Sequence, residues 1–399
     1  MTTSLSSSSA PARSVAVTLL PIMAAVLAGF VVIGAALPVL PLHVNQDLGF
    51  GTLVVGLVAG AQFAASVATR IWSGSYSDAH GGKRSVLLGL VAAVAAGLLY
   101  LLSLVFAHSP IISIVILLIG RAVLGGAESF IITGGVSWGL AMVDSSHAGK
   151  VIAWVGTAMF AALAFSGPLG AMLFAAHGFA AIGLITTLLP LLLLLLLLRA
   201  PNPPPGPART KSTFRDVIGA VWLPGLGAAL SSIGYCAILA FSSLLYADHG
   251  WRPVWLAFTA FGATLIVARL IFGHLPDTLG GAKIALLFVL VQSAGLILMG
   301  IASNSITAST GAALTGLGYS LVYPGLGVEA VHGTSAENRG LAMGIYTAFL
   351  DVAMALGSPT LGWIADRHSL NAAFLVSAVV TLCTTAAALH LAYGMQRGR

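Results

Sequence analysis

The chain has 399 residues, of which 58% are hydrophobic and 7% are charged, and its mean hydropathy is +1.02. Soluble domains carry about 25% charged residues, so this composition excludes an ordinary water-soluble protein and predicts a membrane protein. The formal net charge of +6 comes from Lys and Arg residues scattered singly at the ends of apolar runs. That pattern is typical of membrane orientation signals and argues against a nucleic-acid-binding face.

Long apolar runs follow one another along the whole chain, and alternating ten-residue strand patterns are absent. A helix needs about 20 apolar residues to cross a bilayer, and unpaired backbone groups are too costly in hydrocarbon for open, irregular structures. We therefore expect an all-α polytopic membrane protein with twelve transmembrane helices. The spans are expected near residues 15–42, 51–72, 85–107, 111–142, 151–176, 179–198, 217–246, 255–272, 284–302, 306–331, 341–365 and 371–393.

A proline-rich stretch divides the spans into two sets of six. Residues 199–216 include Pro-Asn-Pro-Pro-Pro-Gly-Pro, which cannot continue a helix, so we expect a linker between an N-terminal bundle (15–198) and a C-terminal bundle (217–393). Tails at 1–14 and 394–399 complete the chain. With the N-terminus inside, 14 of the 17 Lys and Arg residues fall on the cytoplasmic side, which predicts that both termini and the linker are cytoplasmic.

The two halves are related by a repeat at a fixed offset. A polar stretch at 74–84, after the second span, returns at 273–283, after the eighth, 199 positions later. A repeat of half the chain length, with an even number of spans in each copy, indicates two parallel bundles. The matched residues are Arg70 and Arg269, Gly74 and Gly273, Asp78 and Asp277, and Gly81 and Gly280; Lys83, Arg84 and Lys283 add basic groups.

These stretches have the residues that a conformational gate needs. Gly81 and Gly82 tolerate the positive φ of a tight turn between two spans. Asp78 can accept backbone N–H bonds at the N-terminus of a neighbouring helix, and such a contact can hold one state and break in another. An ordinary polar turn is the alternative, but the repeated carboxylate at Asp277 argues against it. We predict gating loops that close the cytoplasmic side of an outward-facing state.

Three motifs together resemble the major facilitator superfamily. The stretch Gly74-x-x-x-Asp78-x-x-Gly81-x-Lys83-Arg84 resembles its signature loop, and Gly120-Arg121-x-x-x-Gly125-Gly126 resembles its second motif. Gly167-Pro168-x-Gly170 is similar to the glycine–proline motif of its proton antiporters, and the segment from Gly316 to Pro324 is similar to bacterial drug-efflux or sugar-efflux proteins. The resemblance implies alternating access by rocking of two bundles around a substrate cavity.

Three charged residues fall deep inside predicted spans. Arg121 lies ten positions into the fourth span, where an intramembrane charge costs about 2.5–3.5 kcal/mol, so it should face a cavity or a partner. Glu128 lies on the same helical face about two turns on, too far for a direct pair with Arg121. Asp351 lies midway along the eleventh span. Glu128 and Asp351 are candidate proton-coupling carboxylates, modulated by Arg121; static structural ion pairs are the alternative.

The best-supported function is a secondary transporter of the bacterial inner membrane that exports small amphipathic molecules or drugs in exchange for protons. A sugar or organic-solute symporter or facilitator is the alternative within the same fold. An enzyme is not expected, because no convergent nucleophile or metal set is present, and neither a cofactor nor a nucleic acid partner is expected. We expect a monomer in the lipid bilayer. Polar and aromatic candidates for the cavity wall are Gln62, Trp154, Ser231, Tyr235, Tyr319 and Tyr323.

Overall fold

The structure is a computed structural model that describes residues 15–143, 148–200, 214–332, 334 and 339–397. The expected N-terminal tail at 1–14, most of the linker and the last two residues of the C-terminal tail lie outside the described residues. Within the described part, the chain folds into helices joined by short turns, without strands. The expected all-α fold is confirmed.

Every predicted span coincides with a helix or with two consecutive helices. The elements are α1 (Val15–Ala36), α2 (Leu40–Leu42), the π-helical turn η1 (His43–Asp47), α3 (Thr52–His80), α4 (Gly82–Val105), α5 (Pro110–Met142), α6 (Ala148–His177), α7 (Phe179–Leu197), α8 (Phe214–Asp248), α9 (Leu256–Phe272), α10 (Leu275–Leu279), α11 (Gly281–Gly300), α12 (Ser305–His332), α13 (Arg339–Arg367), α14 (Leu370–Leu382) and α15 (Thr384–Arg397).

Among the described residues, ten helical segments are long and apolar enough to cross a membrane. Two elements at the positions of predicted spans are not among these ten. The first, α9, is apolar but has 17 residues; the second, α12, has 28 residues and is rich in Gly, Ser and Thr. Because α12 packs against α8, α9 and α11, much of its surface faces protein, and small residues suit such close packing in a membrane.

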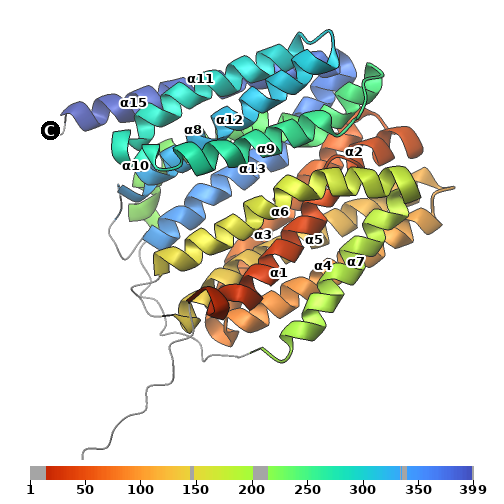
Figure 1. The fold of residues 1–399 in the computed structure, drawn as a ribbon, viewed down its shortest axis with the longest axis horizontal. Helices are drawn as coiled ribbons and strands as arrows, with labels where there is room; N and C mark the ends of the chain where they lie inside the picture. The colour runs from red at the N-terminus through yellow and green to blue at the C-terminus, as the bar shows by residue number, and fades with distance from the viewer. Residues whose placement is uncertain (1–14, 144–147, 201–213, 333, 335–338, 398–399) are drawn as a thin grey trace, which may run out of the picture.

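The helices form two groups that lie side by side (Figure 1). In the first group α4 packs against α5 and α7, α3 against α5, and α1 against α6; in the second, α12 packs against α9 and α11, and α8 against α13 and α14. The groups meet mainly where α3 packs against α13, with a smaller contact between α6 and α9. We refer to them as the N-terminal and C-terminal bundles.

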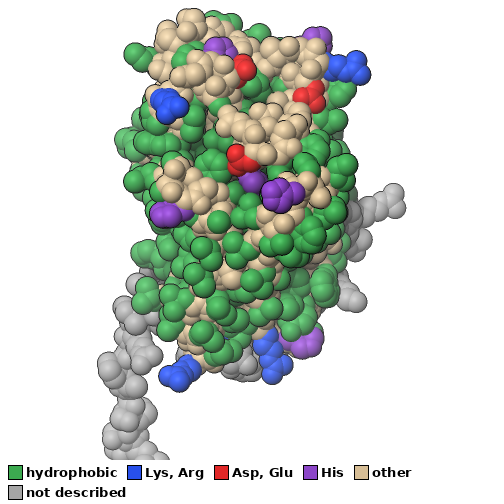
Figure 2. Space-filling view, turned by 90° about the vertical axis from the view of Figure 1, so that its right-hand side faces the viewer, with side chains coloured by type: hydrophobic (Ala, Val, Ile, Leu, Met, Phe, Trp, Pro, Cys, Tyr) green, Lys and Arg blue, Asp and Glu red, His purple; other side chains and the backbone are tan. Residues whose placement is uncertain are grey.

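The molecular surface supports a membrane setting. One face shows a hydrophobic band, with charged side chains gathered towards its two ends (Figure 2). Large apolar side chains project from the helices, including Ile71 at 84% exposure and Leu270 at 80%. Contiguous exposed apolar surface of this kind is unfavourable in water but matches hydrocarbon.

The repeated stretches differ from the expected polar loops. In the first copy α3 continues through His80, because nothing between Gly74 and His80 interrupts a helix, and only Gly81 turns the chain, with φ 87°. In the second copy α9 ends at Phe272 and the five-residue α10, with Pro276 near its start, leads to Gly280, with φ 97°. The predicted positive φ holds for Gly81 but not for Gly82, which begins α4.

Candidate functional site

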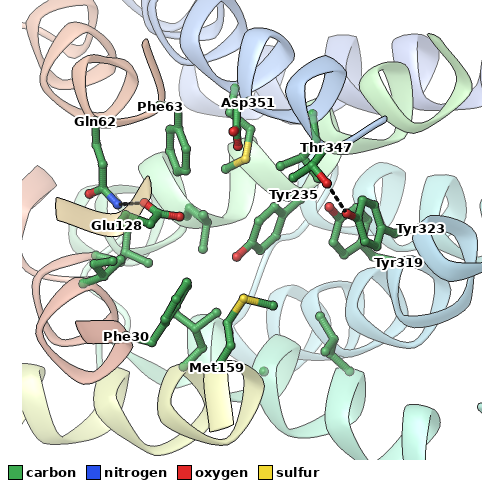
Figure 3. A pocket seen from close by; sticks show the side chains of 18 of the residues that line it. Phe30, Gln62, Phe63, Glu128, Met159, Tyr235, Tyr319, Tyr323, Thr347 and Asp351 are labelled. Carbon is green, nitrogen blue, oxygen red and sulfur yellow. Dashed lines mark hydrogen bonds between the residues drawn. The ribbon is translucent and has the colours of Figure 1, made fainter. Parts of the chain in front are cut away.

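A cavity lies between the two bundles, in the interior of the molecule (Figure 3). Its volume is about 150 Å³, and its walls come from α1, α3, α5 and α6 on one side and α8, α9, α12 and α13 on the other. The walls are mostly apolar, with a few polar and charged groups. Of the six predicted lining residues, Gln62, Tyr235, Tyr319 and Tyr323 line this cavity.

Three tyrosine side chains, Tyr235, Tyr319 and Tyr323, belong to the wall on the side of the C-terminal bundle. Tyr235 stacks on Tyr319 with ring centroids 4.8 Å apart, and Tyr319 lies 6.4 Å from Tyr323, which lies 5.1 Å from Tyr346. Three of the hydroxyl groups have partners: Tyr319 with Ser232 at 3.3 Å, Tyr323 with Thr347 at 3.4 Å, and Tyr346 with the Tyr323 carbonyl at 2.5 Å. This arrangement offers flat apolar faces to the cavity while the hydroxyl groups of these three rings are satisfied.

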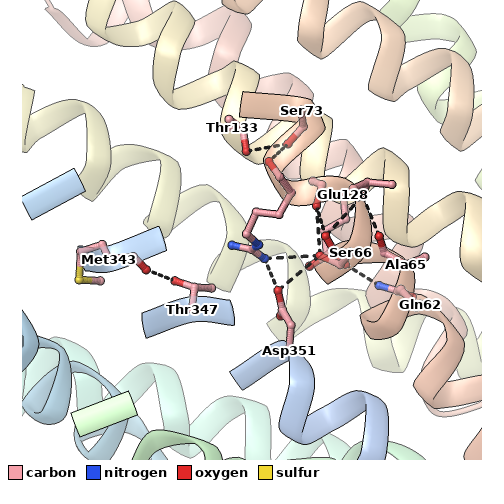
Figure 4. Close-up of polar contacts among 12 residues, drawn as sticks. Gln62, Ala65, Ser66, Ser73, Glu128, Thr133, Met343, Thr347 and Asp351 are labelled. Carbon is pink, nitrogen blue, oxygen red and sulfur yellow. Dashed lines mark hydrogen bonds and ion pairs between the residues drawn. The ribbon is translucent and has the colours of Figure 1, made fainter. Parts of the chain in front are cut away.

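An ion pair joins the two bundles at the cavity wall (Figure 4). Arg70 of α3 donates from Nη2 to Asp351 Oδ2 of α13, and both residues line the cavity. Ser66, one turn before Arg70, lies 3.5 Å from the same carboxylate oxygen and 3.4 Å from Arg70 Nη2. The Asp351 side chain is 4% exposed and that of Arg70 is 21% exposed, so the charges compensate one another in a largely desolvated place.

Glu128, the second predicted carboxylate, also reaches the cavity (Figure 3). Its Oε2 accepts a hydrogen bond of 2.7 Å from Gln62 Nε2 on α3. Gly125 permits this contact, because a Cβ there would lie 1.9 Å from the Gln62 carbonyl oxygen. The close approach of α3 and α5 therefore depends on a residue without a side chain, and it places a carboxylate beside a neutral amide inside the bilayer.

Arg121 lies inside the N-terminal bundle and does not line the cavity. Its side chain is fully buried, and Nη1 donates to the Tyr100 hydroxyl over 3.3 Å, while Nε and Nη2 have no hydrogen-bond partner among the described residues. No ion pair joins Arg121 to Glu128 in the described part of the chain, in agreement with the predicted spacing. Arg121 thus has the partner expected of an intramembrane charge, but a neutral one.

Two predicted lining residues lie elsewhere. Trp154 of α6 is 39% exposed and does not line the cavity. Ser231 of α8 is fully buried inside the C-terminal bundle, where its hydroxyl donates to Gln292 Oε1 of α11 over 2.7 Å. The sequence could not separate these positions from the cavity face, because α8 and α6 are apolar all round and carry little amphipathic pattern.

The glycine–proline motif lies where α6 meets two other helices. A Cβ at Gly170 would lie 2.0 Å from the Ala35 carbonyl oxygen of α1, and one at Gly167 would lie 2.3 Å from the Phe258 ring of α9. Gly167 therefore belongs to the contact between the bundles, and Pro168 is accommodated inside α6. The motif has a packing role in this structure, and its antiporter role remains a prediction.

The basic and acidic groups of the repeated stretches have different surroundings. Lys83 Nζ donates to the carbonyl oxygens of Leu198 and Ala200 at 2.9 and 2.6 Å, which places a cation at the C-terminal end of α7, a favourable position for positive charge. Asp78 and Asp277 are exposed and make no hydrogen bond or ion pair with another described residue. The remaining basic members, Arg84 and Lys283, are also exposed.

The sequence placed Arg70 and Arg269 with the gating loops, but the structure places both in the cavity wall. The 199-residue offset was the available signal: equivalent positions of the repeat, one in α3 and one in α9, carry an arginine that faces the cavity. Arg269 donates to the Ser320 carbonyl over 3.4 Å. Arg269 and Tyr323 also line a neighbouring hollow of about 490 Å³ that contains Asp277, so the cavity extends towards the end of the molecule that carries the repeated stretches. We call this the loop end.

Two helical bundles with a cavity lined by both of them define a polytopic membrane transporter. The sequence matches the profile of the Major Facilitator Superfamily over residues 22–327 and again over 226–395. The chain therefore belongs to the Major Facilitator Superfamily, as its motifs predicted, and it is a transporter rather than an enzyme.

Bacterial relatives extend over nearly the whole chain. An uncharacterized MFS-type transporter of Salmonella typhimurium is 38% identical over 379 residues, covering 95% of this chain and 97% of the relative. Another, YhhS of Escherichia coli, is 35% identical and covers 88% and 86%. Among solved structures, an inward-facing, occupied bacterial homologue of the human lysosomal transporter Spinster has a TM-score of 0.77 at 14% identity, with 96% and 98% coverage. The nucleoside transporter NupG has a TM-score of 0.70 at 12% identity, with 94% and 98% coverage. At such identities the likeness concerns the fold.

Proposed function

We propose that this transporter is a monomeric exporter of the bacterial inner membrane that moves small amphipathic molecules outward in exchange for protons, by alternating access. The observation that carries the proposal is the pairing of Arg70 with Asp351 across the two bundles, in the wall of a cavity that Glu128 also reaches. A proton that neutralises Asp351 would free Arg70 and loosen the contact between the bundles. Proton binding would thereby be linked to bundle movement.

The chemistry of the wall favours amphipathic substrates over sugars. Flat tyrosine and phenylalanine faces suit an apolar ring or chain, and few groups are placed to orient a molecule. A sugar site would need many hydrogen-bonding side chains, because each buried hydroxyl of the ligand must be paired. One chain supplies both halves of the wall, which supports a monomer as the working unit.

The charge pattern supports one orientation of the protein in the membrane, and that orientation in turn indicates the conformational state of the structure. If both termini are cytoplasmic, the loop end faces the cytoplasm, and the cavity, which extends towards that end, belongs to an inward-facing state. The Spinster homologue of similar fold is described as inward-facing, which supports the same assignment. Asp78 and Asp277, exposed and without partners among the described residues in this state, are then free to act as gates when the cytoplasmic side closes.

The proposal is tested in everted membrane vesicles whose acidic interior quenches a pH-sensitive acridine dye. A panel of small amphipathic compounds is added one at a time, and an exchanged substrate restores fluorescence because protons leave as it enters. We expect Glu128→Gln and Asp351→Asn to abolish this response. Glu329→Gln is the matched control, because Glu329 is a buried carboxylate that bonds the backbone N–H of Ala282 and lies outside the cavity wall. Unchanged responses in both cavity variants would contradict proton coupling through these residues.

A further inference from the structure

The end of the molecule opposite the loop end is closed by a contact between α3 and α13. The carboxylate of Asp366, next to the last residue of α13, accepts hydrogen bonds from the backbone N–H groups of Thr52 and Leu53, at 2.6 and 3.1 Å. The Thr52 hydroxyl also donates to Asp366 Oδ1 at 2.7 Å and lies 2.8 Å from the Gly362 carbonyl. The C-terminal end of one helix therefore caps the N-terminus of a helix in the other bundle.

The backbones of the two helices approach closely beneath this contact. A Cβ at Gly56 would lie 2.2 Å from the Ser358 carbonyl oxygen, and one at Gly362 would lie 2.3 Å from the Thr52 carbonyl oxygen. Small residues at these positions let α3 and α13 touch along this half of their length. The contact is therefore built into the interface and is more than a meeting of two surface side chains.

The position of Asp366 is that of a gate. A hollow of about 690 Å³ lies outside the contact, lined by Thr52, Asp366 and Asp248 among others, and shares no lining residue with the central cavity. The first N–H groups of a helix have no partner within the helix, and a carboxylate there is favoured by the helix dipole. Because Asp366 is exposed, water can replace these bonds, so the contact can open.

The same pair of helices carries a carboxylate at its other end. Asp78 lies in the last turn of α3, exposed and unbonded within the described chain, at the loop end where α13 begins with Arg339. The two helices are antiparallel, so each bears an aspartate near its C-terminus, at the end of the pair where the other helix begins. Under alternating access, separation of one end would accompany closure of the other.

We propose that Asp366 is the gate residue of the end opposite the loops, and that the contact of Asp366 with Thr52 and Leu53 sets the equilibrium between the two states. This inference rests on alternating access. Loss of the contact shifts the population towards a conformation open at the Asp366 end and closed at the loop end. Asp78→Asn shifts it the other way.

The test measures distances between spin labels in the purified, full-length protein by electron–electron double resonance. In a background with Cys236→Ala and Cys383→Ala, one label pair replaces the exposed residues Gln46 and His368 at the Asp366 end. A second pair replaces Ala79 and Arg339 at the loop end. Charge-assisted hydrogen bonds are the stronger kind, so we expect Asp366→Asn to raise the ratio of the long to the short distance at the Asp366 end by about tenfold or more.

Two further variants keep the outcome interpretable. Asp248→Asn removes an exposed carboxylate from the same hollow, one that makes no hydrogen bond or ion pair with α3 among the described residues, and should leave the ratio unchanged. Thr52→Val removes only the hydroxyl bonds and should shift the ratio in the same direction by less, which covers the case in which Asp366→Asn fails to fold. If Asp366→Asn and Thr52→Val both leave the ratio unchanged while Asp78→Asn changes it, the gate role of Asp366 is wrong and alternating access stands. If every variant, Asp78→Asn included, shows only one distance for each label pair, both the gate role of Asp366 and alternating access are wrong.

Discussion

Arg70 and Asp351 belong to different bundles, so any movement of one bundle against the other must change their contact. Two features make the pair suitable for coupling rather than for static support alone. Both residues border the cavity, where a ligand or a proton can reach them, and Ser66 offers an alternative partner to either charge. An ion pair desolvated on all sides would have neither property.

The pair should show strong energetic coupling. Removing one partner of a buried ion pair costs about 3–5 kcal/mol, because the other charge is left without compensation. We expect Asp351→Asn and Arg70→Gln each to lower the thermal unfolding midpoint in detergent, and the double variant to unfold above at least one of the single variants. Asp248→Asn, which removes an exposed carboxylate on α8, is the control and should change little. Additive losses in the double variant would refute direct coupling.

At the scale of elements, the site depends on how closely α3 and α5 approach. Gln62 reaches Glu128 because Gly125 has no side chain, whereas the next residue, Gly126, has space: a Cβ there would meet only Thr69, at 3.7 Å. Two adjacent glycines of one sequence motif therefore have different roles. One is required by the packing of two helices and the other is not.

This difference can be measured with a single added methyl group at each position. Gly125→Ala forces the backbone of α3 away and should destabilise the protein by about 1–3 kcal/mol, the usual cost of overpacking, and weaken the Gln62–Glu128 bond. Gly126→Ala should unfold within a degree or two of the parent protein. Thermal unfolding followed by tryptophan fluorescence compares them, and equal midpoints would show that α3 and α5 are not in close contact at Gly125.

The elements were largely predictable, but their mutual contacts were not. Apolar length alone located the spans, since hydrocarbon leaves the backbone few choices, and buried charges indicated Glu128 and Asp351. The partner of Asp351 was not predicted, because Arg70 and Asp351 are 281 residues apart and their pairing depends on how α3 meets α13. Thr52 and Asp366 were missed for the same reason. On uniformly apolar helices the sequence also carries no periodic signal for the direction of a side chain. This explains why Trp154 and Ser231 were wrongly expected to line the cavity.

At the scale of the whole molecule, the repeat in the sequence and the arrangement of the two bundles both indicate two related halves. The 199-residue offset predicts equivalent positions in the two halves, and Arg70 and Arg269 occupy such positions in the cavity wall. The equivalence is incomplete: Lys83 binds the end of α7, whereas in the C-terminal bundle Glu329 of α12 binds the start of α11. The two bundles thus share the arginine that faces the cavity but differ in their loop-end contacts.

The orientation of the molecule in the membrane determines which state the structure represents, and it can be tested directly. In the background without Cys236 and Cys383, we expect a cysteine at Gln46 to react in intact cells with a maleimide that cannot cross the membrane. A cysteine at Arg84 should react only after the cells are permeabilised; both native side chains are exposed in the structure. The reverse pattern would place the loop end outside, and the cavity would then open away from the cytoplasm. The positive charges gathered at the loop end favour the first result, because Lys and Arg are retained on the cytoplasmic side during insertion.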